Sequence, residues 1–355
     1  MMQTVIIGTG SYIPEVKVPN TSFSDHVFFE KGGVQQAKNM AGVIEKFSSI
    51  TGIHERRYAR PDQLASDLGY LAAEAAIKNA DIDRETLDYI IVAHNFGDVT
   101  FEGNRSSMVP SLSSRIKALL GIRNPDCVAY DLPFGCPGWL EGLIQENTFI
   151  RSGAARRCLI IGTETLSRVI DPHDKDSMIY SDGSGAVIVE GRPGEAGIIS
   201  WKTQTHAFEH AHLLSMGSSY SPFTENKADI FLKMNGRKVY EFALNHVPLL
   251  IKSVLDKANV HISEVKRILI HQANDKMDSA IVERIFKLYG LHVVPEDIMP
   301  MTIGWLGNSS VATLPTLLDL ILNDKMPGHS LTQSDKVIFA SVGAGMNINA
   351  VLYQF

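Results

Sequence analysis

Two separated blocks of the chain repeat at one and the same spacing. Residues 76–92 align with residues 254–270, which lie 178 positions later, and residues 159–161 align with residues 337–339 at the same offset. In each longer block the end of an apolar helical stretch is followed by a polar connection and by apolar residues typical of a buried strand. One offset shared by two blocks indicates an internally duplicated α/β chain.

The boundary between the two halves is predicted near residues 191–194, where Gly-Arg-Pro-Gly is typical of a turn. We expect one domain over residues 1–193 and a second over residues 194–355, in keeping with the length of the chain. Such halves normally pack about a pseudo-twofold axis, so that residues far apart in sequence can meet at the centre.

The composition excludes several classes of protein. The 355 residues are 45% hydrophobic, carry a formal net charge of −6 and contain no basic run, so we expect no nucleic acid partner. The cysteines number three, too few for a disulfide framework, and we recognise neither a signal peptide nor an apolar run of membrane-spanning length. We therefore expect a soluble cytoplasmic protein.

One group of residues is a candidate metal site. His206, His210 and His212 lie close in sequence with Glu209 between them, yet residues 203–216 show neither helical nor strand periodicity that would bring them together. Solvated or locally hydrogen-bonded histidines are the interpretation we favour. We expect neither a metal ion nor an organic cofactor.

Cys136 is the candidate nucleophile. It follows a strand-like segment and precedes an amphipathic helix, with Pro137 suited to a first helical turn and Gly138 allowing close approach to the backbone. A sulfur at the positive end of a helix is expected to favour the thiolate form. The alternative is an inert buried cysteine.

His271 and Asn308 are the candidate partners of Cys136. His271 directly follows the apolar run 267–270, and Asn308 stands shortly before the apolar run 311–314. A thiol that accepts an acyl group and passes it to a carbanion needs a base or donor near its sulfur and an amide donor for the enolate. A core histidine and a helix cap are the alternatives for these two residues.

The motifs together resemble the β-ketoacyl-acyl-carrier-protein synthase III family of the thiolase-like superfamily over nearly the whole chain. They include Cys-Pro-Gly, His-Gln-Ala-Asn, Gly-Asn-Ser and Gly-Ala-Gly. The matching segments are residues 5–10, 51–53, 136–138, 181–186, 234–236, 271–274, 307–309 and 343–345. The resemblance implies the duplicated αβαβα layered fold of that superfamily, with two pseudo-twofold-related halves.

The resemblance also implies roles for these residues. Cys136 would carry the acyl group, and His271 and Asn308 would assist enolate formation by decarboxylation of a malonyl thioester. The backbone of Cys136 and the 343–345 loop, with Ala344 and Gly345, would form the oxyanion hole. The implied partners are an acyl carrier protein, acyl thioesters that include coenzyme A esters, and a second copy of the chain in a homodimer.

Two departures from the family pattern concern coenzyme A. Where many relatives carry Trp-Ile-x-x-Arg, this chain has Lys-Phe-Ser-Ser-Ile at 46–50, and the arginine of a second motif is replaced by Lys175. A planar aromatic ring and a guanidinium fork are thereby lost. Carrier-bound acyl donors are favoured as a result.

Two further sets of residues are assigned from the resemblance. Phe101 and Met108, in a long loop, and Phe134 are expected to shape the acyl pocket, with simple packing as the alternative. The residues expected to dock an acidic carrier are Lys276, Arg284, Lys287 and Arg237. A solvated helix face is the alternative for these four.

Three functions compete. The first is a ketosynthase that condenses an acyl group on Cys136 with a malonyl-carrier extender. The second joins two fatty-acid-derived thioesters into a dialkylresorcinol precursor, as the sequences around Cys136 and Asn308 also suggest. The third is a non-catalytic subunit of a ketosynthase heterodimer, which the intact Cys, His and Asn disfavour. A degradative thiolase is disfavoured because residues 341–345 lack its second cysteine.

Overall fold

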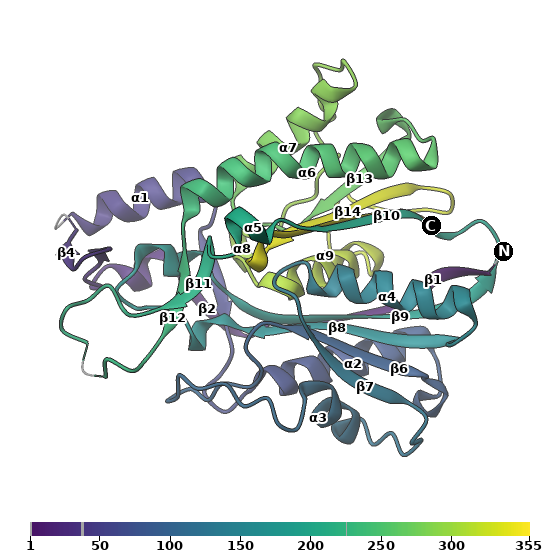
Figure 1. Cartoon of the computed structure of the whole chain (residues 1–355), viewed down its shortest axis with the longest axis horizontal. Helices are drawn as coiled ribbons and strands as arrows, with labels where there is room; N and C mark the ends of the chain where they lie inside the picture. Colours follow the sequence, from purple (N-terminus) through teal and green to yellow (C-terminus); the bar gives the residue numbers. More distant parts are fainter. Residues whose placement is uncertain (1, 37–38, 225) are drawn as a thin grey trace.

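The computed structural model describes residues 2–36, 39–224 and 226–355, which fold into five layers (Figure 1). Two sheets alternate with three layers of helices. The first sheet has the strand order β1 (Met2–Tyr12), β9 (Asp182–Pro193), β8 (Arg157–Thr165), β6 (Tyr89–His94) and β7 (Val128–Pro133). The second has the order β10 (Gly197–Thr205), β15 (Asn347–Gln354), β14 (Lys336–Gly343) and β13 (Val265–Ile270).

The two sheets share one topology, which confirms the predicted duplication. In each, an edge strand pairs antiparallel with a long strand, which pairs antiparallel with a third strand that is parallel to a fourth. The first sheet adds β7 beside β6. The chain passes from one sheet to the other between β9 and β10, which supports the domain boundary at residues 193 and 194; the two-domain division itself stays a prediction.

The repeated blocks take the same local structure in both halves. The first runs from the end of α2 (Ala65–Ala80) into β6, and the second from the end of α6 (Gly236–Ala258) into β13. Both helices end at a left-handed residue, Asp81 with φ 50° and Asn259 with φ 55°, again 178 positions apart. A left-handed residue satisfies carbonyls at a helix end and turns the chain back toward the sheet.

Two helices occupy the centre of the molecule. α4 (Gly138–Ser152) and α9 (Thr313–Leu322) lie between the sheets and contact strands of both (Figure 1). The outer face of the first sheet is covered by α2 and α3 (Leu112–Leu119), and that of the second by α6 and α7 (Asp275–Leu288). α4 and α9 are therefore shielded from water on both sides, and nine of the ten α9 residues are buried. The layered α/β class is thus confirmed.

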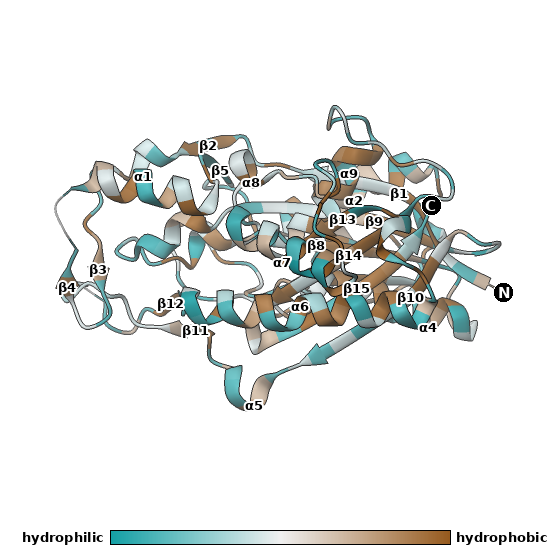
Figure 2. Ribbon diagram, turned by 90° about the horizontal axis from the view of Figure 1, so that it is seen from above, coloured by the Kyte–Doolittle hydropathy of each residue, from teal (hydrophilic) through white to brown (hydrophobic). Residues whose placement is uncertain are grey.

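The smaller elements gather at the end of the molecule opposite to the termini (Figure 2). Here α1 (Met40–Thr51) and the hairpin of β11 (Leu214–Gly217) and β12 (Phe231–Met234) approach the start of α6. The remaining short elements are β2 (Val16–Pro19), β3 (Phe29–Glu30), β4 (Val34–Gln35), β5 (Glu55–Tyr58), α5 (Ala207–His210) and α8 (Ile303–Leu306). Single 3-10 turns are Asn20–Phe23, Arg84–Thr86, Leu166–Arg168, Lys175–Ile179, Ile262–Glu264, Ser310–Ala312 and Ala344–Met346. Among the described residues, no helix is both long and apolar enough to cross a bilayer.

Candidate active site

Cys136 lies in the tight connection between β7 and α4. Gly135 has φ 69°, Pro137 has φ −68°, and the Gly138 N–H donates to the carbonyl of Gly135 at 2.9 Å. The glycine supplies a left-handed turn that other residues rarely adopt, and the proline is preset for a helix start. α4 thus begins at Gly138, two residues after the thiol, as the sequence predicts.

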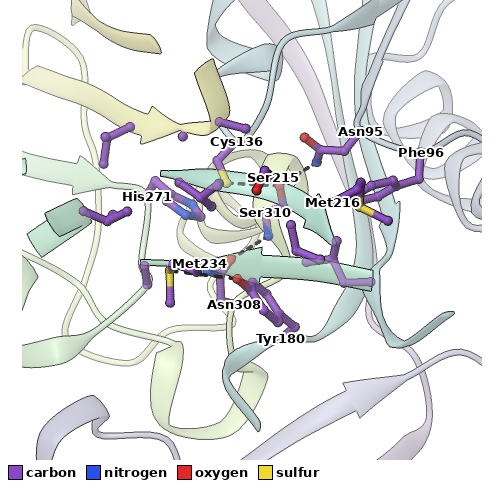
Figure 3. A pocket seen from close by; sticks show the side chains of 18 of the residues that line it. Asn95, Phe96, Cys136, Tyr180, Ser215, Met216, Met234, His271, Asn308 and Ser310 are labelled. Carbon is purple, nitrogen blue, oxygen red and sulfur yellow. Dashed lines mark hydrogen bonds between the residues drawn. The ribbon is translucent and has the colours of Figure 1, made fainter. Parts of the chain in front are cut away.

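His271 and Asn308 reach the same cavity from other elements (Figure 3). His271 follows β13, and its backbone N–H donates to the carbonyl of Ala340 at 2.8 Å. Asn308 follows α8, and two backbone hydrogen bonds, to Ile179 and from Ser181, hold it beside the start of β9. Cys136 follows a strand of the first sheet and His271 follows a strand of the second, so the site lies where the two halves meet.

The cavity beside Cys136, the inner cavity, has a volume of about 220 Å³. Its walls are mainly apolar, and the polar side chains converge at one end around the sulfur. Residues of the lining include Phe96, Leu166, Tyr180, Leu214, Met216, Leu232, Met234, Val239, Ala273, Met277, Val342, Gly343 and Ala344. An apolar pocket with a few convergent polar groups is the common form of a small-molecule site.

Burial sets the protonation of both titratable members of the site. It raises the pKa of the Cys136 thiol to about 11, and a hydrogen bond from Ser310 only partly opposes that increase. In the free protein, desolvation therefore outweighs the stabilisation of the thiolate that is expected from the helix start. Burial also lowers the pKa of His271 to about 4, against a smaller opposing contribution from a hydrogen bond to the Ser310 backbone. His271 is thus neutral near pH 7.

The orientation of the Asn308 side chain follows from its contacts. Its Oδ1 accepts the backbone N–H of Ser310 at 2.8 Å. The amide therefore offers its N–H donors for another group, as stabilisation of an enolate requires. Asn308 is only 5% exposed, so such a donor would act in a poorly hydrated environment.

The loop before β15 packs directly on the Cys136 turn. A Cβ on Gly343 would lie 2.7 Å from the Cys136 nitrogen, and one on Gly135 would lie 2.9 Å from the Ala344 nitrogen. Only glycines allow the two backbones this close. This geometry is compatible with the predicted oxyanion hole of Cys136, Ala344 and Gly345, whose role stays a prediction.

Three predicted pocket residues do not line the inner cavity. Phe101 is 58% exposed and stacks on Arg168, with the guanidinium carbon 4.7 Å from the ring centre. Met108 is 43% exposed, and Phe134 precedes the Cys136 turn without reaching the cavity. The role of these three residues in shaping an acyl pocket stays a prediction.

A larger cavity, the outer cavity, adjoins the inner one and has a volume of about 650 Å³. The two share Met234, Val239, Ala273, Met277 and Asn308 in their linings. The other residues around the outer cavity include Val43, Lys46, Phe47, Ile50, Lys175, Asp176, Met178, Ile179, Arg237 and Tyr240. α1, which carries the altered segment 46–50, therefore forms one wall of the outer cavity.

The four predicted docking residues fall into different environments, although all are exposed. Arg237 lines the outer cavity and pairs with Glu241, and Lys276 stands in the first turn of α7 beside Met277. Arg284 donates to the carbonyl of Leu244 at 2.9 Å and so joins α7 to α6. Lys287, near the other end of α7, pairs with Glu283 at 3.7 Å.

The histidines considered for a metal site lie against aromatic rings. His206 and His210 pack on Phe242, and His206 also packs on His246 with ring centres 4.5 Å apart. Within residues 2–36, 39–224 and 226–355, no group of three His, Cys, Asp or Glu residues is arranged to hold a metal ion.

Sequence reasoning missed three polar residues around the sulfur. Ser310 Oγ lies 3.2 Å from Cys136 Sγ, Asn95 donates to Ser310, and Glu164 accepts from Asn95 (Figure 3 shows Asn95 and Ser310). Asn95 and Glu164 stand where β6 and β8 end. Polar residues directly after or at the end of buried parallel strands were a usable signal, because such ends meet at one edge of a sheet.

Comparisons with known proteins identify relatives over the whole chain. Residues 130–207 match the family described as 3-oxoacyl-(acyl-carrier-protein) synthase III, and residues 255–355 match its C-terminal family. The chain is 31% identical over 355 residues to β-ketoacyl-(acyl-carrier-protein) synthase III 1 of Vibrio vulnificus, covering 100% of both chains.

Solved structures agree with these matches. The chain resembles 3-oxoacyl-(acyl-carrier-protein) synthase III of Aquifex aeolicus with a TM-score of 0.82 and 26% identity, covering 99% of this chain and 100% of the other. An OleA variant of Xanthomonas campestris gives a TM-score of 0.78 at 16% identity, with 100% of both chains covered. At that identity the likeness shows the fold alone.

Proposed function

Because the chain belongs to the 3-oxoacyl-(acyl-carrier-protein) synthase III family of condensing acyltransferases, we propose that it acylates Cys136 and extends the acyl group with a malonyl-carrier thioester. The observation that carries this proposal is the meeting of Cys136, His271 and Asn308 on one cavity. The three residues come from three separate connections in two sheets, and a structural role for each would not require them to share a cavity. A non-catalytic subunit has no need of this arrangement.

The first step would be transfer of the acyl group to the enzyme. The Cys136 sulfur forms a bond to the acyl carbonyl carbon, the thioester bond of the donor breaks, and the thiol proton ends on the released donor thiol. Backbone N–H groups of Cys136 and the 343–345 loop would hold the oxygen that becomes negative during this step. Cys136 lines the apolar inner cavity, which suits an acyl chain.

The second step would form the carbon-carbon bond. The malonyl thioester loses carbon dioxide, and the electron pair of the broken bond gives an enolate that the N–H groups of His271 and Asn308 stabilise. The enolate carbon attacks the thioester carbonyl on Cys136, and the sulfur leaves as thiolate. Burial lowers the pKa of His271 to about 4, so near pH 7 the ring is neutral and carries one N–H donor for this role.

A second candidate is the condensation of two fatty-acid-derived thioesters to a dialkylresorcinol precursor. The feature that favours it is the outer cavity, whose volume of about 650 Å³ exceeds that of the inner one. Val43, Phe47 and Ile50 of α1 give it an apolar wall, which includes part of the segment 46–50 where this chain departs from the family pattern for coenzyme A. Two adjoining apolar cavities suit two hydrocarbon chains.

The charges near the outer cavity favour a carrier-bound substrate. Lys46, Lys175 and Arg237 line that cavity, and Lys276 is exposed next to its lining residue Met277. An acidic carrier protein would be attracted to such a rim. Acyl carrier protein is therefore the proposed partner, and the homodimer inferred from the family is part of the same proposal.

Intact-mass spectrometry tests the proposed function directly. The protein is incubated with acyl-carrier and acyl-coenzyme A thioesters of several chain lengths, and peptide mapping locates the added acyl mass. We expect it on Cys136, and chasing with malonyl-carrier should release a product two carbons longer. Acylation followed by release only with a long 3-oxoacyl thioester would favour the second candidate. No acylation with any donor would overturn both.

A further inference from the structure

Ser310 adopts a conformation that is uncommon for its residue type. Its φ is 54°, in the left-handed region, and it is 3% exposed. This conformation turns its backbone N–H to Asn308 Oδ1, 2.8 Å away, and its hydroxyl to Cys136 Sγ, 3.2 Å away. Backbone conformations of this kind persist where surrounding contacts hold them, often at functional sites.

Asn95 determines where the hydroxyl hydrogen of Ser310 points. Asn95 Nδ2 lies 3.0 Å from Ser310 Oγ, and an amide nitrogen can only donate. Ser310 Oγ is thus the acceptor from Asn95, and its single hydrogen is left for the sulfur. A donor aimed at the sulfur stabilises the thiolate more than the thiol, because hydrogen bonds to ionised groups are the stronger ones.

Glu164 in turn fixes the orientation of Asn95. Its Oε2 accepts the Asn95 backbone N–H at 2.8 Å and the Asn95 side-chain Nδ2 at 2.5 Å. Two bonds to one oxygen keep Nδ2, rather than Oδ1, on the side of Ser310. Glu164 is fully buried near the end of β8, and Asn95 follows the adjacent parallel strand β6, so the sheet itself holds the pair in place.

We propose that Glu164 and Asn95 are positioning residues that aim the Ser310 hydroxyl at the Cys136 sulfur and thereby stabilise its thiolate. The inference rests on the proposed function in that Cys136 is taken as the nucleophile. Ser310 keeps its proton throughout: its hydrogen bond is strong to the thiolate before acylation, weak to the thioester, and strong again when the sulfur leaves.

Several other titratable groups surround the sulfur and have to be separated from this effect. His271 and Tyr180 face the same cavity, and His94 and Asp182 interact electrostatically with Glu164. Burial raises the pKa of Glu164 to about 7, so its own charge varies near neutrality. A charged Glu164 opposes a thiolate on Cys136, whereas its hydrogen bonds to Asn95 favour one, and the two effects have opposite signs.

The test is the pH dependence of Cys136 alkylation by iodoacetamide, followed by mass spectrometry, which needs no acyl substrate. We expect Ser310→Ala to raise the alkylation midpoint by about one pH unit, or about tenfold in rate at a pH below both midpoints. Ser310→Gly should give the same shift, since it loses the same hydroxyl while its backbone accepts the left-handed conformation. Ser309→Ala is the control, because the hydroxyl of Ser309, also buried, lies 3.3 Å from Thr313 Oγ1.

Two variants of Glu164 separate position from charge. Glu164→Gln keeps an oxygen acceptor for Asn95 and removes the charge, so its midpoint should equal or fall below that of the wild type. Glu164→Leu removes the acceptor as well and should have a higher midpoint than Glu164→Gln. Circular dichroism shows which variants are folded, and Ser310→Gly serves if Ser310→Ala is not.

The proposal and the proposed function fail in different ways. An unchanged midpoint in a folded Ser310 variant, or equal midpoints in the two Glu164 variants, would overturn the positioning role. Wild-type protein that alkylates as expected but accepts no acyl group would instead overturn the proposed function.

Discussion

Asn308 lies in the wall between two cavities that differ in size and in the groups around them. The inner cavity, about 220 Å³, brings Cys136, His271 and Asn308 together, and the polar groups around the sulfur are buried or half-buried. The outer cavity, about 650 Å³, combines the apolar side of α1 with exposed cations. Chemistry therefore depends on a few closely placed groups, whereas the choice of substrate depends on a broad surface to which each residue contributes little.

The largest effect is expected at the sulfur itself. Cys136→Ala should reduce acyl transfer to the background level, because it removes the atom that carries the acyl group. Cys158→Ala should leave it unchanged, since Cys158 is fully buried in the core and lines neither cavity. Acyl mass per chain measures both. Persistent acylation of Cys136→Ala would place the nucleophile elsewhere.

The next largest effect is expected at Asn308, which lines both cavities. Asn308→Ala should lower condensation by about 10²-fold or more, since one preorganised donor to a developing charge is lost. Self-acylation should fall much less, because the enolate forms only in the second step. His271→Ala should likewise lower condensation far more than self-acylation. Rapid-quench measurement of acylation and product formation compares them, and wild-type condensation in both variants would make these residues structural.

The sequence allowed the fold and the roles of Cys136, His271 and Asn308 to be predicted, but not the residues around them. The difference has physical reasons. Residues 76–92 and 254–270 predict one unit twice, because helix, turn and buried strand each have a local sequence pattern. Ser310 has no such pattern, since its role depends on a left-handed turn. The strand ends predict where Asn95 and Glu164 lie, but not that the two residues pair. The surroundings of Phe101 could not be predicted, because an apolar side chain in a long loop can face the solvent as well as a pocket.

The inner cavity also makes the stability of the protein depend on pH. Burial lowers the pKa of His271 from 6.5 to about 4, so between pH 7 and pH 5 the unfolded chain takes up a proton there that the folded protein does not. The free energy of unfolding that neutral His271 contributes is fully present above the pKa of the unfolded chain, 6.5, and is lost as the pH falls toward the folded pKa of about 4. We expect wild-type protein to lose about 2 kcal/mol more free energy of unfolding over this interval than His271→Asn. Urea denaturation at both pH values measures the difference, and equal losses would mean that His271 is solvated.

A smaller effect is expected from the apolar wall of the outer cavity. Ile50→Asp should lower kcat/KM for a long 3-oxoacyl thioester about tenfold, because about 1.4 kcal/mol of apolar contact is lost, and should change malonyl-carrier less than twofold. Ser49→Asp adds the same charge at the neighbouring position of α1, which does not line this cavity. Equal losses with both substrates would show that no hydrocarbon chain contacts Ile50.

The smallest effect concerns the cations at the rim. Lys276→Glu should raise the KM for an acyl-carrier substrate about threefold to fivefold, since an exposed charge interaction is worth at most about 1 kcal/mol. The KM for a short pantetheine thioester should not change, because that molecule lacks the acidic carrier surface. Added salt should reduce the difference between wild type and variant, as screening weakens attraction between exposed charges.

Lys287→Glu is the matched variant at the far end of α7. Lys287 is exposed like Lys276, but it pairs with Glu283 and lines neither cavity. If the carrier docks at the outer cavity, reversal at Lys287 should alter KM less than reversal at Lys276. Equal effects would mean that the carrier senses the whole basic face of α7, and a larger effect at Lys287 would move the docking site away from the outer cavity. A loss with the pantetheine thioester as well would locate the role of Lys276 in the passage to Cys136 rather than in docking.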